Sequence, residues 1–136
     1  SMLPQKETIR NSGLRVTPTR IAVLKALEDS ASPLDITTIA KHLEKQKITA
    51  DQTTLYRIID SFLEKKLATR LQFQEKKFYY EARKPEHHHA VCISCGSIED
   101  IERCTIKRVE QRIEESKGFR VLTHSLEFFG KCKNCK

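Results

Sequence analysis

Apolar positions in the first third of the chain repeat at helical spacing. The stretch after Thr17-Pro18 carries an apolar stripe, and threonine followed by proline is a typical helix start. A shorter helix is predicted before it, ending at Asn11-Ser12-Gly13. Asp35 can cap a further helix. Its apolar positions, at i, i+3, i+4 and i+7, are Ile36, Ile39, Ala40 and Leu43. The pattern therefore predicts three short helices that pack on one another.

The segment from Asp51 to Lys66 has two different faces at helical spacing. The apolar face consists of Leu55, Ile58, Ile59, Phe62 and Leu63. The polar face consists of Thr53, Thr54, Tyr56, Arg57 and Asp60. Residues 69–82 then alternate apolar with polar positions, with a turn at Glu75-Lys76-Lys77, which predicts a β-hairpin. Three helices, a fourth with a polar outer face and a basic-tipped hairpin predict a winged helix-turn-helix module.

The second half of the chain has a mixed pattern and begins after the polar segment Arg83-Lys84-Pro85-Glu86. We expect a short strand through the three histidines, another near residues 97–101 and a helix around 105–116. Residues 119–130 are predicted to form the last and longest strand. The expected fold class is α+β, with domains at 1–83 and 84–136.

The charge of the chain favours a polyanionic partner. Lysine and arginine number 25 against 18 acidic residues, a formal charge of +7, and residues 1–83 hold 15 basic and 10 acidic residues. No apolar run approaches the roughly 20 residues of a membrane span, and no secretory signal opens the chain, so we expect a cytoplasmic protein without a membrane partner. Nucleic acid fits best, because the basic excess coincides with the predicted winged helix.

The polar face of the fourth helix carries side chains suited to reading DNA. Tyr56 can contact thymine methyl groups, and Arg57 can contact a base edge or a phosphate. Thr53 and Thr54 can reach the DNA backbone. The alternative interpretation is a solvated helix face, which the flanking helices and the hairpin disfavour.

Four of the five cysteines form two C-x-x-C pairs. Cys92-x-x-Cys95 and Cys132-x-x-Cys135 are separated by 36 residues, and the odd cysteine, Cys104, stands alone. An odd number of cysteines without a signal peptide argues against a disulfide framework. Two such turns make a tetrahedral thiolate cage suited to structural zinc, with no open position. The alternatives, free thiols or redox pairs, need two independent coincidences. Cys104 is expected to be a small packing or surface residue.

The three consecutive histidines cannot all face one way in a strand. His87 and His89 share one side and His88 points to the other, because side chains alternate. Glu81 and Asp100 are expected on adjoining strands. Together with His87 and His89 they would form a metal site with open coordination positions, suited to Fe(II), Mn(II) or Zn(II). The absence of a thiolate disfavours a dedicated zinc sensor. The alternative is a solvated polar segment.

His88 can also take part in metal binding, on the opposite side of the strand. Together with His124, expected on the last strand, it suggests an additional, weaker site. The competing interpretation for this pair is again a solvated polar segment.

Taken together, these motifs resemble the ferric uptake regulator (Fur) family of metal-dependent bacterial transcription factors. The resemblance covers nearly the whole chain, through GLRVTPTR at 13–20, TTLYR at 53–57, the histidine strand running into Cys92-x-x-Cys95-Gly96, HSLEFFG at 124–130 and the last C-x-x-C. It implies an N-terminal winged-helix domain followed by a small C-terminal α/β dimerisation domain.

The resemblance also implies a role for each motif. Structural zinc would be held by Cys92, Cys95, Cys132 and Cys135, and the regulatory metal by Glu81, His87, His89 and Asp100. The recognition helix would contain Thr53, Thr54, Tyr56 and Arg57, and Arg15 falls where a basic residue enters the minor groove. The implied protein is a homodimeric repressor that binds AT-rich, pseudopalindromic double-stranded DNA when its regulatory metal is bound.

The chain departs from the family pattern at three positions. Iron- and peroxide-sensing members supply a further histidine ligand where this chain has Ser32-Pro33-Leu34. Lys107 stands where many members have a carboxylate of the additional site, and His88 where an aspartate is common. Zinc-sensing members often place a cysteine near Glu81, and its absence favours an iron, manganese or peroxide sensor, Fur/PerR-like rather than Zur-like.

Three competing functions remain at this point. One is a zinc-sensing repressor of the same family. Another is a zinc-ribbon adaptor that binds nucleic acid or protein, which leaves the capped helices and the hairpin unexplained. The third is a metalloenzyme that uses an open coordination position to activate water. The sequence shows neither a placed general base nor a substrate-binding loop, so we do not expect an enzyme.

Overall fold

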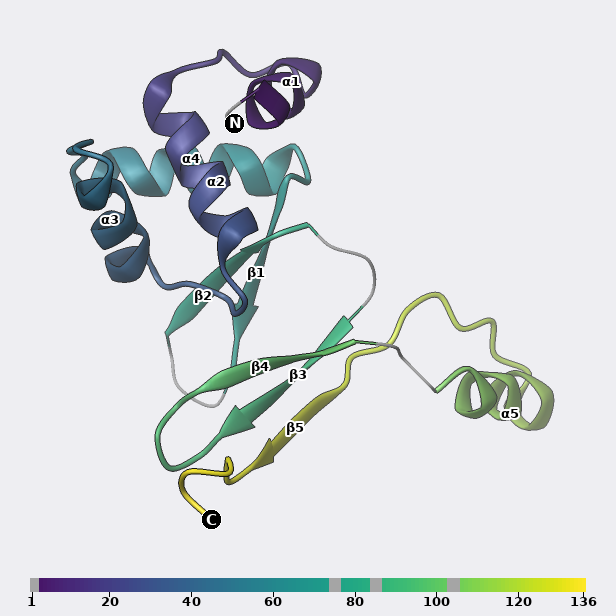
Figure 1. Ribbon diagram of the computed structural model, residues 1–136. Helices are drawn as coiled ribbons and strands as arrows, with labels where there is room; N and C mark the ends of the chain where they lie inside the picture. The colour runs from purple at the N-terminus through teal and green to yellow at the C-terminus, as the bar shows by residue number, and fades with distance from the viewer. Residues whose placement is uncertain (1–2, 74–76, 84–86, 103–105) are drawn as a thin grey trace. The chain divides into compact units, whose positions relative to one another are not determined.

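The computed structural model describes residues 3–73, 77–83, 87–102 and 106–136 (Figure 1). The chain divides into two compact units, Ser1–Arg83 and Lys84–Lys136. Several positions with predicted roles lie outside the described residues, namely Glu75 and Lys76 of the hairpin turn, Lys84-Pro85-Glu86 of the predicted boundary, and Cys104.

Four helices make up most of the first unit: α1 (Leu3–Asn11), α2 (Pro18–Asp29), α3 (Ile36–Lys45) and α4 (Gln52–Glu64). Three of them begin where a side chain accepts a hydrogen bond from the first turn. Thr17 Oγ1 accepts from the Arg20 N–H at 3.2 Å, and the carboxylates of Asp35 and Asp51 accept at 2.7 Å from the N–H three residues ahead. The predicted caps at Thr17 and Asp35 are confirmed.

The core of the first unit is built from the predicted apolar faces. On α4, the buried side chains are Leu55, Ile58, Ile59 and Phe62, while Leu63 is half-buried. They pack in one cluster with α1, α2 and α3, whose most deeply buried members are Ile9, Val23, Leu24, Leu27, Ile39 and Leu43. The opposite, polar face of α4 is therefore left to solvent.

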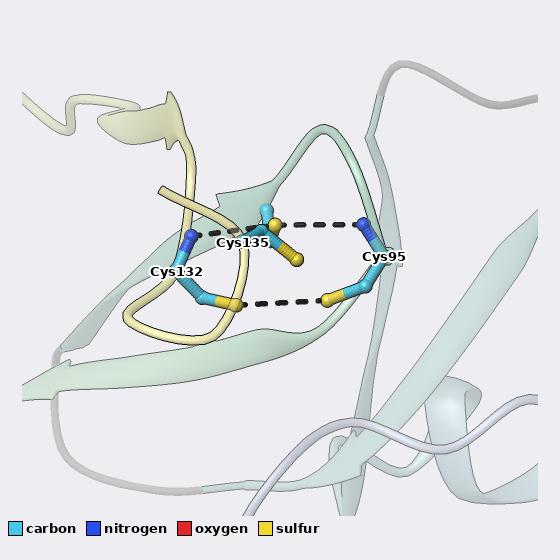
Figure 2. A group of neighbouring side chains, drawn as sticks. Cys95, Cys132 and Cys135 are labelled. Atoms are coloured by element: carbon cyan, nitrogen blue, oxygen red, sulfur yellow. Dashed lines mark hydrogen bonds between the residues drawn. The ribbon is translucent and has the colours of Figure 1, made fainter.

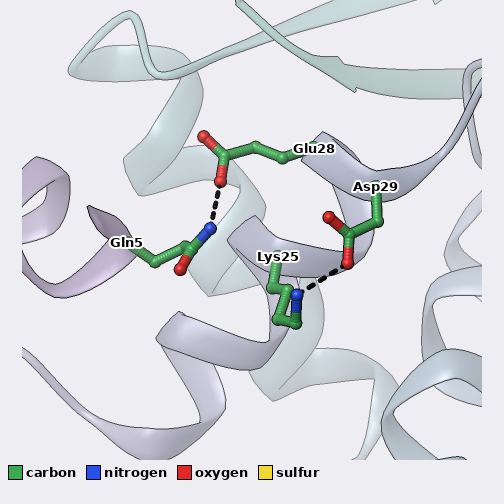
Figure 3. A network of polar contacts seen from close by, with 4 residues as sticks. All are labelled: Gln5, Lys25, Glu28 and Asp29. Atoms are coloured by element: carbon green, nitrogen blue, oxygen red, sulfur yellow. Dashed lines mark hydrogen bonds and ion pairs between the residues drawn. The ribbon is translucent and has the colours of Figure 1, made fainter. Parts of the chain in front are cut away.

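Helix α1 is also attached to α2 by a polar contact. Gln5, which is buried, donates from Nε2 to Oε1 of Glu28 at 2.7 Å (Figure 3). One turn of α2 earlier, Lys25 pairs with Asp29 at 2.8 Å on the exposed side. The first contact joins two helices, whereas the second stays within α2 and contributes at most a few tenths of a kcal/mol.

The hairpin of the first unit forms as predicted. Strands β1 (Ala68–Gln72) and β2 (Phe78–Ala82) pair antiparallel, with Arg70 opposite Tyr80. Leu34 adds a short bridge to the second strand, because its N–H and C=O bond those of Tyr80 at 2.8 and 2.7 Å. Four helices and this hairpin are a winged helix-turn-helix arrangement.

The second unit is a small α/β structure. Strands β3 (His87–Cys92), β4 (Ile98–Glu102) and β5 (Glu127–Gly130) form one sheet in the order β4-β3-β5, and α5 (Lys107–Lys117) connects the last two in sequence. β3 pairs antiparallel with β4 and parallel with β5. The expected strands at 87 and 97–101 and the expected helix are confirmed within about two residues.

The prediction of a long last strand is wrong. β5 has four residues, against six in β3, and residues 118–126 have no regular structure. The register accounts for most of the difference: Glu127 pairs with His89, so a parallel strand that began at residue 119 would need partners before His87. β3 runs from His87 to Cys92, so residues 119–124 have no partner on it in this register. Phe119 and Leu122 are 67% and 81% exposed.

Helix α5 has an apolar side that the described residues leave partly exposed. Val109 is 52% and Ile113 is 37% exposed, and none of the residues of α5 is buried.

Among the described residues, no helix combines the length and the hydropathy needed to cross a membrane.

Candidate metal centres and nucleic-acid interface

The parallel pairing of β3 with β5 brings the two C-x-x-C turns together. Cys92 is the last residue of β3 and lies opposite Gly130, the last residue of β5. Both turns therefore follow the same end of the sheet. Gly96, with φ of 78°, closes the first turn in a conformation that favours glycine. One sulfur from each of Cys92, Cys95, Cys132 and Cys135 lies within 4.8 Å of the other three.

The four thiols face one another, and they differ in acidity. Figure 2 shows the Cys95 and Cys132 sulfurs pointing together, 3.8 Å apart. The N–H groups of Cys95 and Cys132 donate to the Cys92 sulfur at 3.5 and 3.3 Å and lower the pKa of Cys92 to about 6. The neighbouring thiols, Cys132 first, raise the pKa of Cys135 to about 12.

The pKa directions are not the same for all four thiols. Backbone donors stabilise the thiolate of Cys92, and a hydrogen bond with Ser97 lowers the pKa of Cys95, whereas the neighbouring thiols oppose ionisation of Cys135. Four thiolates this close together also repel one another. A divalent metal offsets that repulsion and allows all four sulfurs to ionise. Four sulfur donors within coordination reach fit tetrahedral zinc and leave no position for a substrate or water.

A second donor group lies on one face of the histidine strand. The His87 and His89 rings are 4.8 Å apart between centroids, and His89 Nε2 lies 3.4 Å from Oδ1 of Asp100. The register places Asp100 directly opposite His89 on β4. One ligand atom from each of these three residues lies within 4.8 Å of the other two. Two imidazoles and a carboxylate suit a borderline divalent metal.

Glu81 is the fourth predicted member of this set and belongs to the first unit. It lies on β2 with its side chain 3% exposed. The expectation that both carboxylates flank the histidine strand holds for Asp100, whereas the strand of Glu81 pairs with β1 in a separate sheet. The participation of Glu81 in metal binding stays a prediction.

His88 points to the other side of the strand and meets His124. Their Nε2 atoms are 3.2 Å apart, and Nδ1 of His124 lies 3.1 Å from Oε1 of Glu110. His124 does not lie on a strand as expected, because it belongs to the irregular segment before β5. Glu110 was not among the predicted site residues. The available signal was its position three residues after Lys107, on the same face of α5.

The predicted DNA-reading side chains are presented by α4 and by the segment before α2. Thr53, Thr54, Tyr56 and Arg57 are all exposed, with Tyr56 at 42%. They lie on the face of the helix opposite Leu55 and Ile58, which the core holds. Arg15 is exposed between α1 and α2.

The chain is similar to known proteins along most of its length. The model of the Ferric uptake regulator family matches residues 11–129. The chain belongs to the ferric uptake regulator family. It is 32% identical over 129 residues to the peroxide operon regulator of Bacillus subtilis, covering 95% of this chain and 89% of that protein. It is 29% identical over 130 residues to the ferric uptake regulation protein of Neisseria meningitidis, covering 94% and 90%.

Solved structures of Fur proteins share the fold. The crystal structure of the ferric uptake regulator of Vibrio cholerae superposes with a TM-score of 0.81 at 25% identity, covering 94% of this chain and 99% of that one. The chain accordingly has the Fur architecture of an N-terminal winged helix-turn-helix domain and a C-terminal α/β dimerisation domain.

Family membership decides between the classes of function left open by the sequence. Fur-family proteins are metal-responsive, homodimeric, DNA-binding transcription regulators and not enzymes. The metalloenzyme interpretation is therefore excluded, and the zinc-ribbon adaptor loses its basis because the family match includes the winged helix.

Proposed function

We propose that this Fur-family protein is a homodimeric transcriptional repressor in the cytoplasm, controlled by iron, manganese or peroxide through a histidine and carboxylate site. The observation that carries the proposal is that one short strand, β3, supplies ligands to two donor sets of different chemistry. Cys92 at its end belongs to an all-sulfur group, whereas His87 and His89 belong to a nitrogen and oxygen group. Two donor sets of such different softness suit two metals with different jobs.

The all-sulfur set is proposed to hold structural zinc. Its ligands, Cys92, Cys95, Cys132 and Cys135, join the start of the second unit to the end of the chain. Zinc bound there stabilises the fold and takes no part in sensing, because the coordination shell is closed.

The second set is proposed to hold the regulatory metal, with Glu81, His87, His89 and Asp100 as ligands. Fe(II) and Mn(II) accept imidazole and carboxylate donors and keep open positions for water or peroxide. Zn(II) binds such donors too, so a zinc-sensing repressor is the competing function, and the absence of a thiolate in the set disfavours it. Pro33 has no side-chain donor, so we propose that the shell is completed by water or by another residue.

A weaker additional site is proposed at His88 and His124. The Nε2 atoms of these residues already face each other at 3.2 Å, and Glu110 holds the other nitrogen of His124. Glu110 orients that ring, which is the role that a carboxylate beside a metal-binding histidine commonly has.

DNA binding is proposed to use α4 as the recognition helix. Tyr56 and Arg57 read base edges in the major groove, while Thr53 and Thr54 contact the phosphate backbone. Arg15 enters the adjacent minor groove. The minor groove of A·T-rich DNA is narrow, and its negative potential attracts arginine. A two-fold dimer requires two such half-sites in a pseudopalindrome.

Metal binding is proposed to control DNA binding through the placement of Glu81. This residue is on the wing of the DNA-binding unit, while His87, His89 and Asp100 belong to the dimerisation unit. A metal that takes ligands from both favours one arrangement of the domains, and DNA affinity changes by the difference in metal affinity between arrangements.

The proposal is tested by metal analysis together with DNA binding. Protein purified with and without oxygen is analysed for zinc, iron and manganese, and each form is tested on a duplex selected from a random library. We expect one tightly held zinc per chain and DNA binding that responds to Fe(II) or Mn(II). Two tightly held zinc ions per chain with no response to iron or manganese would instead indicate a zinc sensor.

A further inference from the structure

The segment that carries Arg15 is fixed at both ends. The N–H of Leu14 donates to the carbonyl of Ile9 at 3.3 Å, which anchors the segment to the end of α1. At the other end, Thr17 caps α2. Leu14 and Val16 pack against the core on either side of Arg15. Arg15 is thus the exposed residue of a short, anchored connection.

Arg20 adds a contact that acts on the peptide of Arg15 itself. Nη1 of Arg20 donates to the carbonyl oxygen of Arg15 at 2.8 Å, across the cap of α2. Arg20 is half-buried, and its own N–H bonds Thr17. The guanidinium is a planar fork, so a bond from one of its nitrogens restricts the orientation of the carbonyl it holds. The carbonyl in turn limits the direction in which the Arg15 side chain leaves the backbone.

We infer that Arg20 is a positioning residue for DNA recognition, which holds the backbone of Arg15 so that the Arg15 side chain is directed into the minor groove. The inference rests on the proposed function, since it requires that Arg15 reads DNA. Preorganisation of this kind raises affinity because less conformational freedom is lost on binding. It also raises the selectivity for DNA with a narrow minor groove, because a side chain that leaves a fixed backbone position can be matched to one groove width.

Direct contact between Arg20 and a phosphate is the competing role, and a double-mutant cycle separates the two. A phosphate contact is independent of Arg15, so the loss from Arg20→Gln is the same with or without Arg15. A positioning role acts through Arg15, so the loss disappears when Arg15 is absent. Arg10→Gln is the matched control, because Arg10 is an exposed arginine on α1 and loses the same charge.

The DNA probe is the AT-rich duplex selected by the metal-loaded wild-type protein. Positions that depend on Arg15 are found with Arg15→Ala, and their A·T pairs are replaced by G·C or by inosine·cytosine. An inosine·cytosine pair lacks the 2-amino group of guanine, so its minor groove resembles A·T while its major groove resembles G·C. A minor-groove reader therefore accepts inosine·cytosine and rejects G·C. Loss of protein stability alone does not change that preference.

The expected results are a loss of about tenfold for Arg15→Ala and about fivefold for Arg20→Gln. In the Arg15→Ala background, Arg20→Gln should lower the affinity for the duplex by less than about twofold, which would show that the two residues are coupled. Arg20→Gln should also reduce the preference for inosine·cytosine over G·C, whereas Arg10→Gln keeps it.

The same measurements can overturn the inference. An equal loss from Arg20→Gln in both backgrounds makes Arg20 a phosphate contact, and a neutral Arg15→Ala removes the role that Arg20 was inferred to support. Either result leaves metal-dependent DNA binding intact. Failure of the wild-type protein to select any duplex in a metal-dependent way contradicts the proposed function instead.

Discussion

Replacement of Cys135 by serine should unfold the second unit while the first stays folded. Among the described residues of the second unit, only His88, His89 and Cys92 are buried, at 7%, 4% and 4% exposed. A unit of this size rarely gains more than about 3–5 kcal/mol from its core. Structural zinc supplies on the order of 10 kcal/mol in comparable small sites. The free energy of unfolding of the second unit therefore depends on zinc more than on apolar burial.

Serine at position 135 removes one sulfur ligand without creating a buried cavity, because Cys135 is half-buried. Hydrogen–deuterium exchange followed by mass spectrometry reports each unit separately. We expect β3 and β5 to lose protection in Cys135→Ser, together with the zinc, while α2 and α4 keep theirs because their core lies within residues 1–83. Cys104→Ser removes a thiol outside the two C-x-x-C pairs and should keep both zinc and protection.

A zinc-free Cys135→Ser protein with wild-type protection in β3 and β5 would refute this reasoning. The second unit would then be stabilised by something other than the thiolate cage. Loss of protection in α2 and α4 to the same extent would show that the two units unfold together, which the separate core of the first unit does not predict.

Other side chains give separate tests. Burial raises the pKa of Asp35, but hydrogen bonds from Lys77 and the first turn of α3 outweigh it and hold the pKa below its usual value. Asp35→Ala should lower the free energy of unfolding by about 1 kcal/mol in urea at neutral pH. That difference should shrink below about pH 4, as the wild-type carboxylate is protonated. Tyr56→Ala should weaken operator binding about tenfold in gel shifts without changing the melting temperature, because Tyr56 is exposed. His89→Ala should abolish the manganese response of DNA binding, whereas His88→Ala should keep most of it.

Features set by neighbouring residues were predictable from the sequence. The caps at Thr17 and Asp35 act on the turn that follows them, so their residue types and positions are sufficient to place the helices. The apolar face of α4 follows from spacing alone. The alternation of His87, His88 and His89 follows from the two-residue period of a strand, and the structure places His88 against His124 accordingly.

Features set by distant pairing were not predictable in the same way. The parallel pairing that places Glu127 opposite His89 is not contained in the pattern of residues 119–130. The contact of Glu110 with His124 depends on the path of the irregular segment 118–126 back toward α5.

Coupling between metal binding and DNA binding can be measured as the affinity of the zinc-containing protein for Mn(II) with and without the selected duplex. Linkage requires that DNA raise the affinity for metal by the same factor as metal raises the affinity for DNA. We expect a factor of at least about ten in both directions, and no coupling in Glu81→Ala. Equal Mn(II) affinity in the presence and absence of the duplex would show that the two binding events are not coupled.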